Sequence, residues 1–312
     1  MKEHRFLTYE QQVALLRSQG LIISDEKKAI QTLSNIGYYE LINGYKRIFK
    51  KSGNGSYFQG TAFEDIHAMY QFDENLRQLF LKYILRVEIH IRSLLSYAFC
   101  RRYSEQQSAY LDPQCFDASM LGHGEVNRLI GELDYAANRS DKAAYVCHHR
   151  SKYGNVPLWV VFKTLSLGTL IRFFRCSTLD IRTEVTDAFY DLREQTLGRM
   201  LDLIQDFRNV CAHNDCLYTY TGPDSIPPMP ILSKVSAENG EYFDFKGNDL
   251  FAVVISMFYL LDESDFTRLV DSIERIIAHL EAGCGSLSRE RLLRAMGFPS
   301  NWDELAKIQK NR

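Results

Sequence analysis

The longest uninterrupted helical pattern constrains the fold more than any other feature of the sequence. It runs from Phe63 to about Tyr103 and contains no proline or glycine. Its apolar residues recur every three to four positions, as they do on one face of an α-helix. The centre of this wide apolar arc is formed by Leu76, Phe80, Ile84, Val87, Ile91, Leu94 and Ala98. A helix this long must be covered by other helices, so the pattern predicts a mainly α fold.

Two charged residues interrupt this long pattern. Glu88 and Arg92 lie among leucines rather than on a clean polar face, and an unpaired charge in such surroundings is too costly. They are four residues apart, which is the spacing for an ion pair on one helix. We therefore expect either an internal Glu–Arg pair or a polar cleft shared with a second helix.

The second helix ends in the stretch from Asp206 to Asp215, which carries an arginine, an asparagine and a histidine within two helical turns. Its apolar stripe is formed by Leu197, Met200, Leu201, Ile204, Phe207 and Cys211. At about 100° per residue, Asp202, Asp206, Asn209 and His213 fall on the opposite face and Arg208 lies at the border of the stripe.

Arg208, Asn209 and His213 are thereby predicted to converge. Asn209 and His213 are i,i+4 neighbours, and the long Arg208 side chain can reach the same spot. The alternative is a solvated polar face of the kind that most amphipathic helices carry. Both interpretations place the three residues on the surface.

Tyrosines and cations alternate in the N-terminal part, which ends at a loop near residue 55. Tyr38, Tyr39 and Tyr45 are followed by Lys46, Arg47, Lys50 and Lys51. Stacking surfaces interleaved with cations suit single-stranded RNA, and the alternative is that the tyrosines pack a helical corner. Arg172 and Arg175 supply further candidate RNA-binding cations. Residues 1–60 are predicted to form a helical lobe separate from residues 61–312.

An irregular segment interrupts the helical chain at about 218–246. Its first part is rich in proline, glycine and threonine, and Asn239-Gly240 is a moderate signal for a β-hairpin. The sequence therefore predicts a small β-hairpin insertion at this point.

Composition excludes several classes of protein. The 312 residues are 46% hydrophobic, enough for a large core, but no apolar run approaches the roughly 20 residues that cross a bilayer. The net charge of −2 argues against a chain that coats nucleic acid, so an RNA ligand needs a local basic patch. Seven cysteines without regular spacing and the absence of an apolar leader predict a cytoplasmic protein with reduced thiols. No metal-ligand spacing or phosphate loop is present, so we expect no metal and no cofactor.

Several stretches, in order along the chain, resemble a known family. The element Arg208-Asn209-x-x-x-His213 is similar to the signature of HEPN-superfamily ribonucleases. Its flanks resemble bacterial Abi proteins of abortive phage infection, closest to the AbiD/AbiF group. The stretches that carry this resemblance are Tyr38 to Tyr45, Phe72 to Phe80, Arg86 to Arg92 and Gly297 to Trp302.

The resemblance implies a HEPN-like helical bundle and an endoribonuclease that needs no metal. Two copies of the motif helix form a composite cleft in that superfamily, and this chain has one copy, so a homodimer is implied. His213 would act as general acid or base, Arg208 would hold the phosphate, and Asn209 would orient His213 or donate to the phosphate. Glu88 and Arg92 would support Arg208 from the long helix.

Two other classes of function stay open. The chain is either an anti-phage ribonuclease and toxin, a non-catalytic protein that binds a structured noncoding RNA, or a regulatory module that binds another protein. The expected partners are single-stranded RNA, a second copy of the chain and a phage-derived trigger, without a membrane. Only the nuclease would leave 2′,3′-cyclic phosphate ends on RNA.

Overall fold

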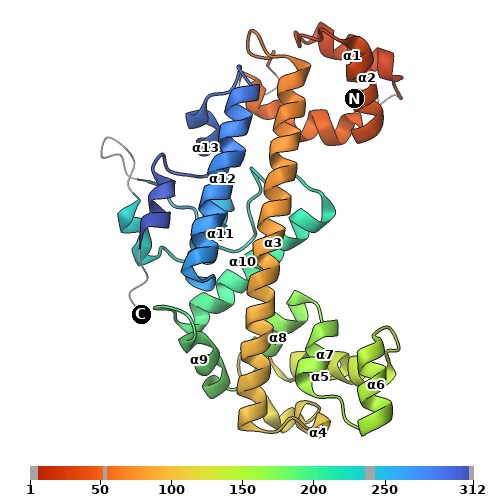
Figure 1. Cartoon of the computed structure of the whole chain (residues 1–312), viewed down its shortest axis with the longest axis vertical. Helices are drawn as coiled ribbons and strands as arrows, with labels where there is room; N and C mark the ends of the chain where they lie inside the picture. The colour runs from red at the N-terminus through yellow and green to blue at the C-terminus, as the bar shows by residue number, and fades with distance from the viewer. Residues whose placement is uncertain (1–5, 52–54, 236–242, 309–312) are drawn as a thin grey trace.

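The chain folds around one long helix. A computed structural model describes residues 6–51, 55–235 and 243–308. Helix α3 (Phe63–Arg102) runs through almost the whole length of the molecule, and the other helices are arranged along it (Figure 1). The mainly α fold predicted from the sequence is thereby confirmed. In the described residues, extended pairing is limited to two isolated bridges, Ile22 with Ala62 and Lys50 with Tyr57.

The N-terminal helices pack at one end of α3. Helix α1 begins after Thr8, whose hydroxyl accepts from the Gln11 backbone N–H in a capping box. Helix α2 begins after Asp25, which caps it in the same way. These elements and the two short turns that follow are α1 (Tyr9–Ser18), α2 (Glu26–Ile36), η1 (Tyr39–Asn43) and η2 (Lys46–Phe49).

A second group of helices covers the other end of α3. It is held by a buried aromatic cluster in which Phe99 of α3 packs edge-to-face against Phe173 and in a tilted arrangement against Phe116. Its elements are α4 (Gln107–Tyr110), η3 (Pro113–Cys115), α5 (His123–Asp134), η4 (Tyr135–Arg139), α6 (Ala144–Tyr153), α7 (Leu158–Val161), η5 (Phe162–Thr164), α8 (Leu167–Cys176) and α9 (Leu179–Asp187).

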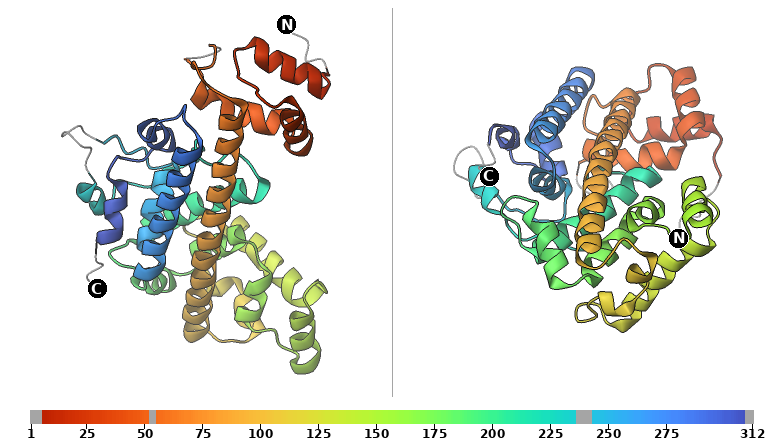
Figure 2. Two further views of the ribbon diagram at one scale, coloured as in Figure 1. Left: turned by 45° about the horizontal axis from the view of Figure 1, so that its top comes forward. Right: turned by 60° about the horizontal axis from the view of Figure 1, so that its bottom comes forward.

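The last helices pack against α3, and α12 and α13 lie across it from α1 and α2 (Figures 1 and 2). Helix α11 is buried along its whole length, which explains its nearly continuous apolar sequence. The elements are α10 (Glu194–His213), η6 (Pro230–Lys234), α11 (Leu250–Leu260), α12 (Glu263–Gly283), α13 (Arg289–Met296) and η8 (Trp302–Lys307). Within the described part of the chain, every helix is too short or too polar to span a lipid bilayer.

The irregular segment after α10 differs from the predicted hairpin where it is described. Its turn, Asn239-Gly240, lies outside the described residues. Residues Pro230–Lys234, at the start of the expected first strand, form the 3-10 turn η6. Pro230 provides a physical reason, because its fixed φ suits the first turn of a helix and it has no backbone N–H to donate to a β-ladder.

Candidate functional site

Helix α10 carries the residues of the candidate site and packs against α3, α8 and α11. The apolar stripe predicted from the sequence is buried, with Leu197, Ile204 and Phe207 at 0% exposure. The helix ends at His213 because Asn214 adopts the left-handed conformation, with φ of 62°. Asparagine tolerates that conformation better than most residues, and its N–H donates to the Val210 carbonyl. His213 therefore occupies the last helical turn.

The three candidate catalytic residues lie on the outer side of α10. Asn209 and His213 are exposed, and Arg208 is partly buried at the border of the stripe, as the helical phase predicts. No carboxylate of the described residues pairs with Arg208, and its buried Nε has no hydrogen-bond acceptor among them. A guanidinium without a protein partner retains its capacity to bind an anion.

Two carboxyl groups lie one and two turns earlier on the same helix. Asp202 is partly buried and bonds to Arg175 of α8. Burial raises the pKa of the Asp202 carboxyl, and Arg175 acts in the opposite direction. Burial, followed by the nearby charge of Asp224, raises the pKa of Asp206. The face that carries Asp202 and Asp206 is thus partly covered by neighbouring elements, whereas its end at Asn209 and His213 is open.

Glu88 and Arg92 pair with each other on α3. Arg92 Nη2 lies 2.6 Å from Glu88 Oε1, which is the internal ion pair, one of the two arrangements expected from the sequence. Arg208 contacts neither residue through a hydrogen bond or ion pair in the described structure. Arg92 Nε is buried and has no acceptor among the described residues. Both side chains are therefore committed to each other rather than to Arg208.

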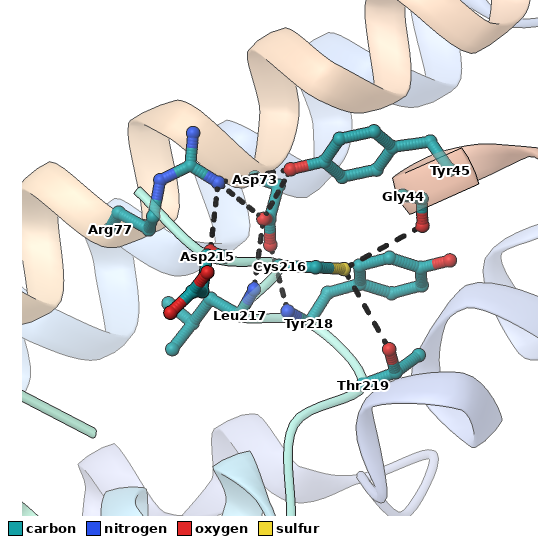
Figure 3. A network of polar contacts seen from close by, with 9 residues as sticks. All are labelled: Gly44, Tyr45, Asp73, Arg77, Asp215, Cys216, Leu217, Tyr218 and Thr219. Carbon is teal, nitrogen blue, oxygen red and sulfur yellow. Dashed lines mark hydrogen bonds and ion pairs between the residues drawn. The ribbon is translucent and has the colours of Figure 1, made fainter. Parts of the chain in front are cut away.

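A buried polar network fixes the chain just after His213 (Figure 3). Asp73 of α3 accepts four hydrogen bonds: from Tyr45 Oη at 2.8 Å, Arg77 Nη1 at 2.6 Å, Leu217 N at 2.9 Å and Tyr218 N at 2.7 Å. The side chain of Asp73 is 0% exposed and that of Arg77 is 3% exposed. One carboxylate thus joins Tyr45 at the start of η2, helix α3 and the segment that follows α10.

The network is charged and fully enclosed. Burial raises the pKa of the Asp73 carboxyl, and the backbone N–H of Leu217 and the Arg77 guanidinium act against that rise. Four donors around one carboxyl group are matched by the ionised form, which has only acceptors. Arg77 Nη1 also donates to the Asp215 carbonyl at 3.3 Å. The backbone from Asp215 to Tyr218 is therefore held against α3 by both members of the ion pair.

Tyr45 packs inside this network rather than offering a stacking face. It is 3% exposed, and its ring lies edge-on to Tyr70 and parallel to Tyr218, with centroids 5.6 Å and 6.0 Å away. This corrects the expectation that Tyr45 stacks on RNA, because no face of its ring is open to a base. Tyr38 is partly buried, and burial raises the pKa of its hydroxyl. Tyr39, in contrast, is 75% exposed.

The cations proposed to bind RNA separate into two groups. Arg172 bonds to Glu125 and Glu132, at 2.9 and 2.8 Å, and Arg175 bonds to Asp202, so both guanidinium groups are committed to carboxylates. The lysines and the arginine of residues 46–51 have no carboxylate partner among the described residues. These four are Lys46, Arg47, Lys50 and Lys51.

The sequence contains a signal for the Asp73 network, although not for the identity of its partners. Asp73 and Arg77 are i,i+4 on α3, the same spacing as Glu88 and Arg92, and both lie on the buried side of the helix. A charged pair in that position requires partners from other elements. No group of three or more His, Cys, Asp or Glu side chains in the described part of the chain is placed to hold a metal ion.

Comparison with known proteins identifies the family. Neither the curated proteins nor the solved structures that were searched gave a match to the chain. The model of one family, Abi-like protein, matches residues 31–219, from α2 through the network segment that follows α10. The match covers more than half of the chain, which therefore belongs to the Abi-like protein family.

Proposed function

We propose that the protein is an abortive-infection endoribonuclease of the HEPN type that cleaves RNA without a metal ion. Family membership supports a role in abortive infection. The single observation that carries the nuclease proposal is the state of Arg208. It is a guanidinium without a carboxylate partner among the described residues, on the same helix as exposed Asn209 and His213. The residues of the short signature Arg208-x4-His213 thus remain able to contact a ligand.

The proposed chemistry needs three functions from protein groups. A base removes the proton from a ribose 2′-hydroxyl, and an acid protonates the leaving 5′-oxygen, giving a 2′,3′-cyclic phosphate and a free 5′-hydroxyl. Histidine can do either, because it exchanges protons near neutral pH. Arg208 offers a planar, permanently charged group to the phosphate oxygens, and Asn209 adds an amide donor.

One chain supplies one histidine of this motif, so we propose a homodimer. Two α10 helices related by a two-fold axis would place two His213 side chains at one cleft, and the two would divide the acid and base roles. The exposed end of α10 supports this arrangement, because Asn209 and His213 lie on its uncovered side. The AbiD/AbiF group within the family is part of the same proposal.

A second function shares some of these features and is tested by the same experiment. The unpaired cations of residues 46–51 would serve equally in a protein that binds a structured noncoding RNA without cutting it. The two functions differ in their products, since only a nuclease leaves cyclic phosphate ends.

The test is cleavage of bulk single-stranded RNA in EDTA by the wild type and by His213→Ala. We expect the variant to lose about 10²- to 10⁴-fold in rate. Its unfolding midpoint should be unchanged, because His213 is exposed. His279→Ala is the matched control, since His279 is an exposed histidine on α12. Equal cleavage by wild type and His213→Ala would reject the assignment, and wild-type binding of RNA without cyclic ends would favour the non-catalytic function.

A further inference from the structure

Five cations lie on two segments, distant in the sequence, that contact each other. Four belong to η2 and the residues that follow it, and the fifth, Arg291, lies on α13. Among the described residues, none of the five has a carboxylate partner. We call this group the basic cluster, and its members are Lys46, Arg47, Lys50, Lys51 and Arg291. Most other arginines of the protein are ion-paired, so an unpaired group of this size requires an explanation.

The fold brings Arg291 to the cluster by specific contacts. Its guanidinium lies 4.0 Å from the centre of the Phe58 ring, and its Nη2 donates to the Lys50 carbonyl at 3.4 Å. Residues 49–51 and 56–58 are joined by backbone hydrogen bonds, from Phe58 N to Phe49 O at 2.9 Å and from Lys51 N to Ser56 O at 3.2 Å. The Arg291 side chain thereby joins helix α13 to this pair of segments.

The like charges of the cluster act on one another. Lys50 Nζ lies 4.5 Å from the centre of the Tyr57 ring and bonds to the neutral Gln19 side chain at 3.3 Å. Burial lowers the pKa of Lys50, and the charge of Lys46 lowers it further. Burial also lowers the pKa of Arg291. A bound polyanion would relieve this repulsion and replace the water lost by the partly buried cations.

Tyr218 links the cluster to the segment that follows α10, because its ring stacks on that of Tyr45, the residue before Lys46, with centroids 6.0 Å apart. Tyr218, whose backbone is fixed by Asp73, lies close enough to Arg47 and Arg291 for both to lower the pKa of its hydroxyl against the rise that burial causes. Tyr218 follows His213 by five residues along the segment of Figure 3. The basic cluster is therefore joined to the segment that leads away from the His213 end of α10.

We propose that the basic cluster, completed by Arg291, binds the phosphates of the single-stranded RNA that flanks the bond cut at the α10 site. This proposal rests on the proposed function. It adds a residue that lies outside the family match, because the match ends at residue 219. Phosphate contacts position a strand without reading its bases, so the cluster fixes where the strand lies and not its sequence. The exposed ring of Tyr39, before η2, offers a surface on which a base can stack.

The test measures RNA binding in the His213→Ala protein, which separates binding from cleavage. The probe is a fluorescein-labelled oligouridylate, followed by anisotropy at several salt concentrations. We expect Arg291→Ala to weaken binding severalfold and to reduce the slope of log affinity against log salt by about 0.7, the value for one phosphate contact on a single strand. Arg291→Lys should retain most of the affinity, because a flanking phosphate needs only a neutralising charge, whereas the reacting phosphate at Arg208 is held by two aligned donors.

Two further variants keep the result interpretable. Arg294→Ala is the control, because Arg294 lies on the same helix, is 78% exposed and pairs with Glu290. Lys51→Ala removes a second, exposed member of the cluster without disturbing the Phe58 contact, and it should weaken binding as Arg291→Ala does. Equal affinities of Arg291→Ala, Lys51→Ala and Arg294→Ala would overturn the proposal.

A membrane ligand is the other outcome that would overturn it. In that case the protein would bind vesicles that contain phosphatidylserine more tightly than it binds the RNA. Arg291→Ala would then weaken binding to the vesicles and not binding to the RNA. The nuclease proposal is judged separately, by cleavage in the protein that retains His213. Arg291-dependent RNA binding without any cleavage would support the cluster and reject the nuclease.

Discussion

The hydroxyl of Tyr45 provides a direct test of the buried network. Tyr45→Phe removes only the oxygen that donates to Asp73 at 2.8 Å and accepts from Arg77 Nη1 at 3.0 Å. The ring and its contacts with Tyr70 and Tyr218 are kept. The variant therefore isolates one hydrogen bond to a buried carboxylate without creating a large cavity.

The expected cost follows from what Asp73 retains. After the substitution it still accepts from Arg77 and from the backbone N–H groups of Leu217 and Tyr218. A hydrogen bond to a charged group contributes about 1.5–3 kcal/mol, so we expect Tyr45→Phe to lower the free energy of unfolding by about 2 kcal/mol. Asp73→Ala is more severe, because it leaves Arg77 buried without a counter-charge, at about 3–5 kcal/mol. That is a large part of the 5–15 kcal/mol typical of a folded protein.

The assay is urea unfolding followed by tryptophan fluorescence and circular dichroism. Tyr39→Phe is the matched control, because Tyr39 is a tyrosine of the preceding turn, η1, and its side chain is exposed. We expect Tyr45→Phe to lower the urea midpoint at an unchanged m-value and Tyr39→Phe to leave both unchanged. Amide hydrogen exchange adds a local measurement, since Leu217 and Tyr218 N–H should exchange faster in Asp73→Asn than in the wild type.

Two results would refute this account of the network. A Tyr45→Phe midpoint equal to that of Tyr39→Phe would show that the bond to Asp73 contributes no net stability. Unchanged exchange of the Leu217 and Tyr218 amides in Asp73→Asn would show that the carboxylate does not hold the segment after α10.

Two further predictions concern the site charge and the buried thiols. Arg208→Lys should recover only part of the cleavage lost in Arg208→Ala, because a point charge cannot replace the planar fork; full recovery in a single-turnover assay would contradict this. Burial raises the pKa of the Cys211 and Cys216 thiols to about 12, whereas an unfolded thiol ionises near about 8.5. The stability from these groups is present below about pH 8.5 and declines as the pH rises toward 12, so the urea midpoint should be lower at pH 9.5 than at pH 7.5. An equal or higher midpoint at pH 9.5 would show that burial does not keep these thiols protonated in the folded protein.

The parts of the fold that the sequence predicts are those governed by local periodicity. The uninterrupted apolar arc predicted α3, and the stripe centred on Ile204 predicted which side of α10 is buried. Both follow from one repeat along one helix, so no knowledge of the remaining chain is required. The phase of this one helix therefore predicts that Asn209 and His213 are exposed, without reference to any tertiary contact.

The network could not be predicted in the same way because its partners are far apart along the chain. Asp73 bonds to Tyr45 and to Leu217, which are separated from it by 28 and 144 positions. Helical phase shows that Asp73 and Arg77 face inward, but not which donors they meet there. For the same reason Tyr45 looked equally suitable for stacking on RNA and for packing, and only its enclosure between Tyr70 and Tyr218 decides between the two.

The charged residues show why the chemistry of a side chain does not define its role. Arg172, Arg175 and Arg208 are equivalent cations in the sequence. In the structure, carboxylates of α5 and α10 form ion pairs with Arg172 and Arg175, whereas no carboxylate of the described residues pairs with Arg208. An arginine already paired would have to break an ion pair before it could bind a phosphate, and an unpaired one loses only water. Among these three, Arg208 is therefore the cation for which binding a phosphate costs least. The same reasoning selects Arg291 over Arg294 on α13, since Glu290 pairs with Arg294 alone. The proposed path for RNA therefore rests on where the unpaired cations of the described residues lie, rather than on their number.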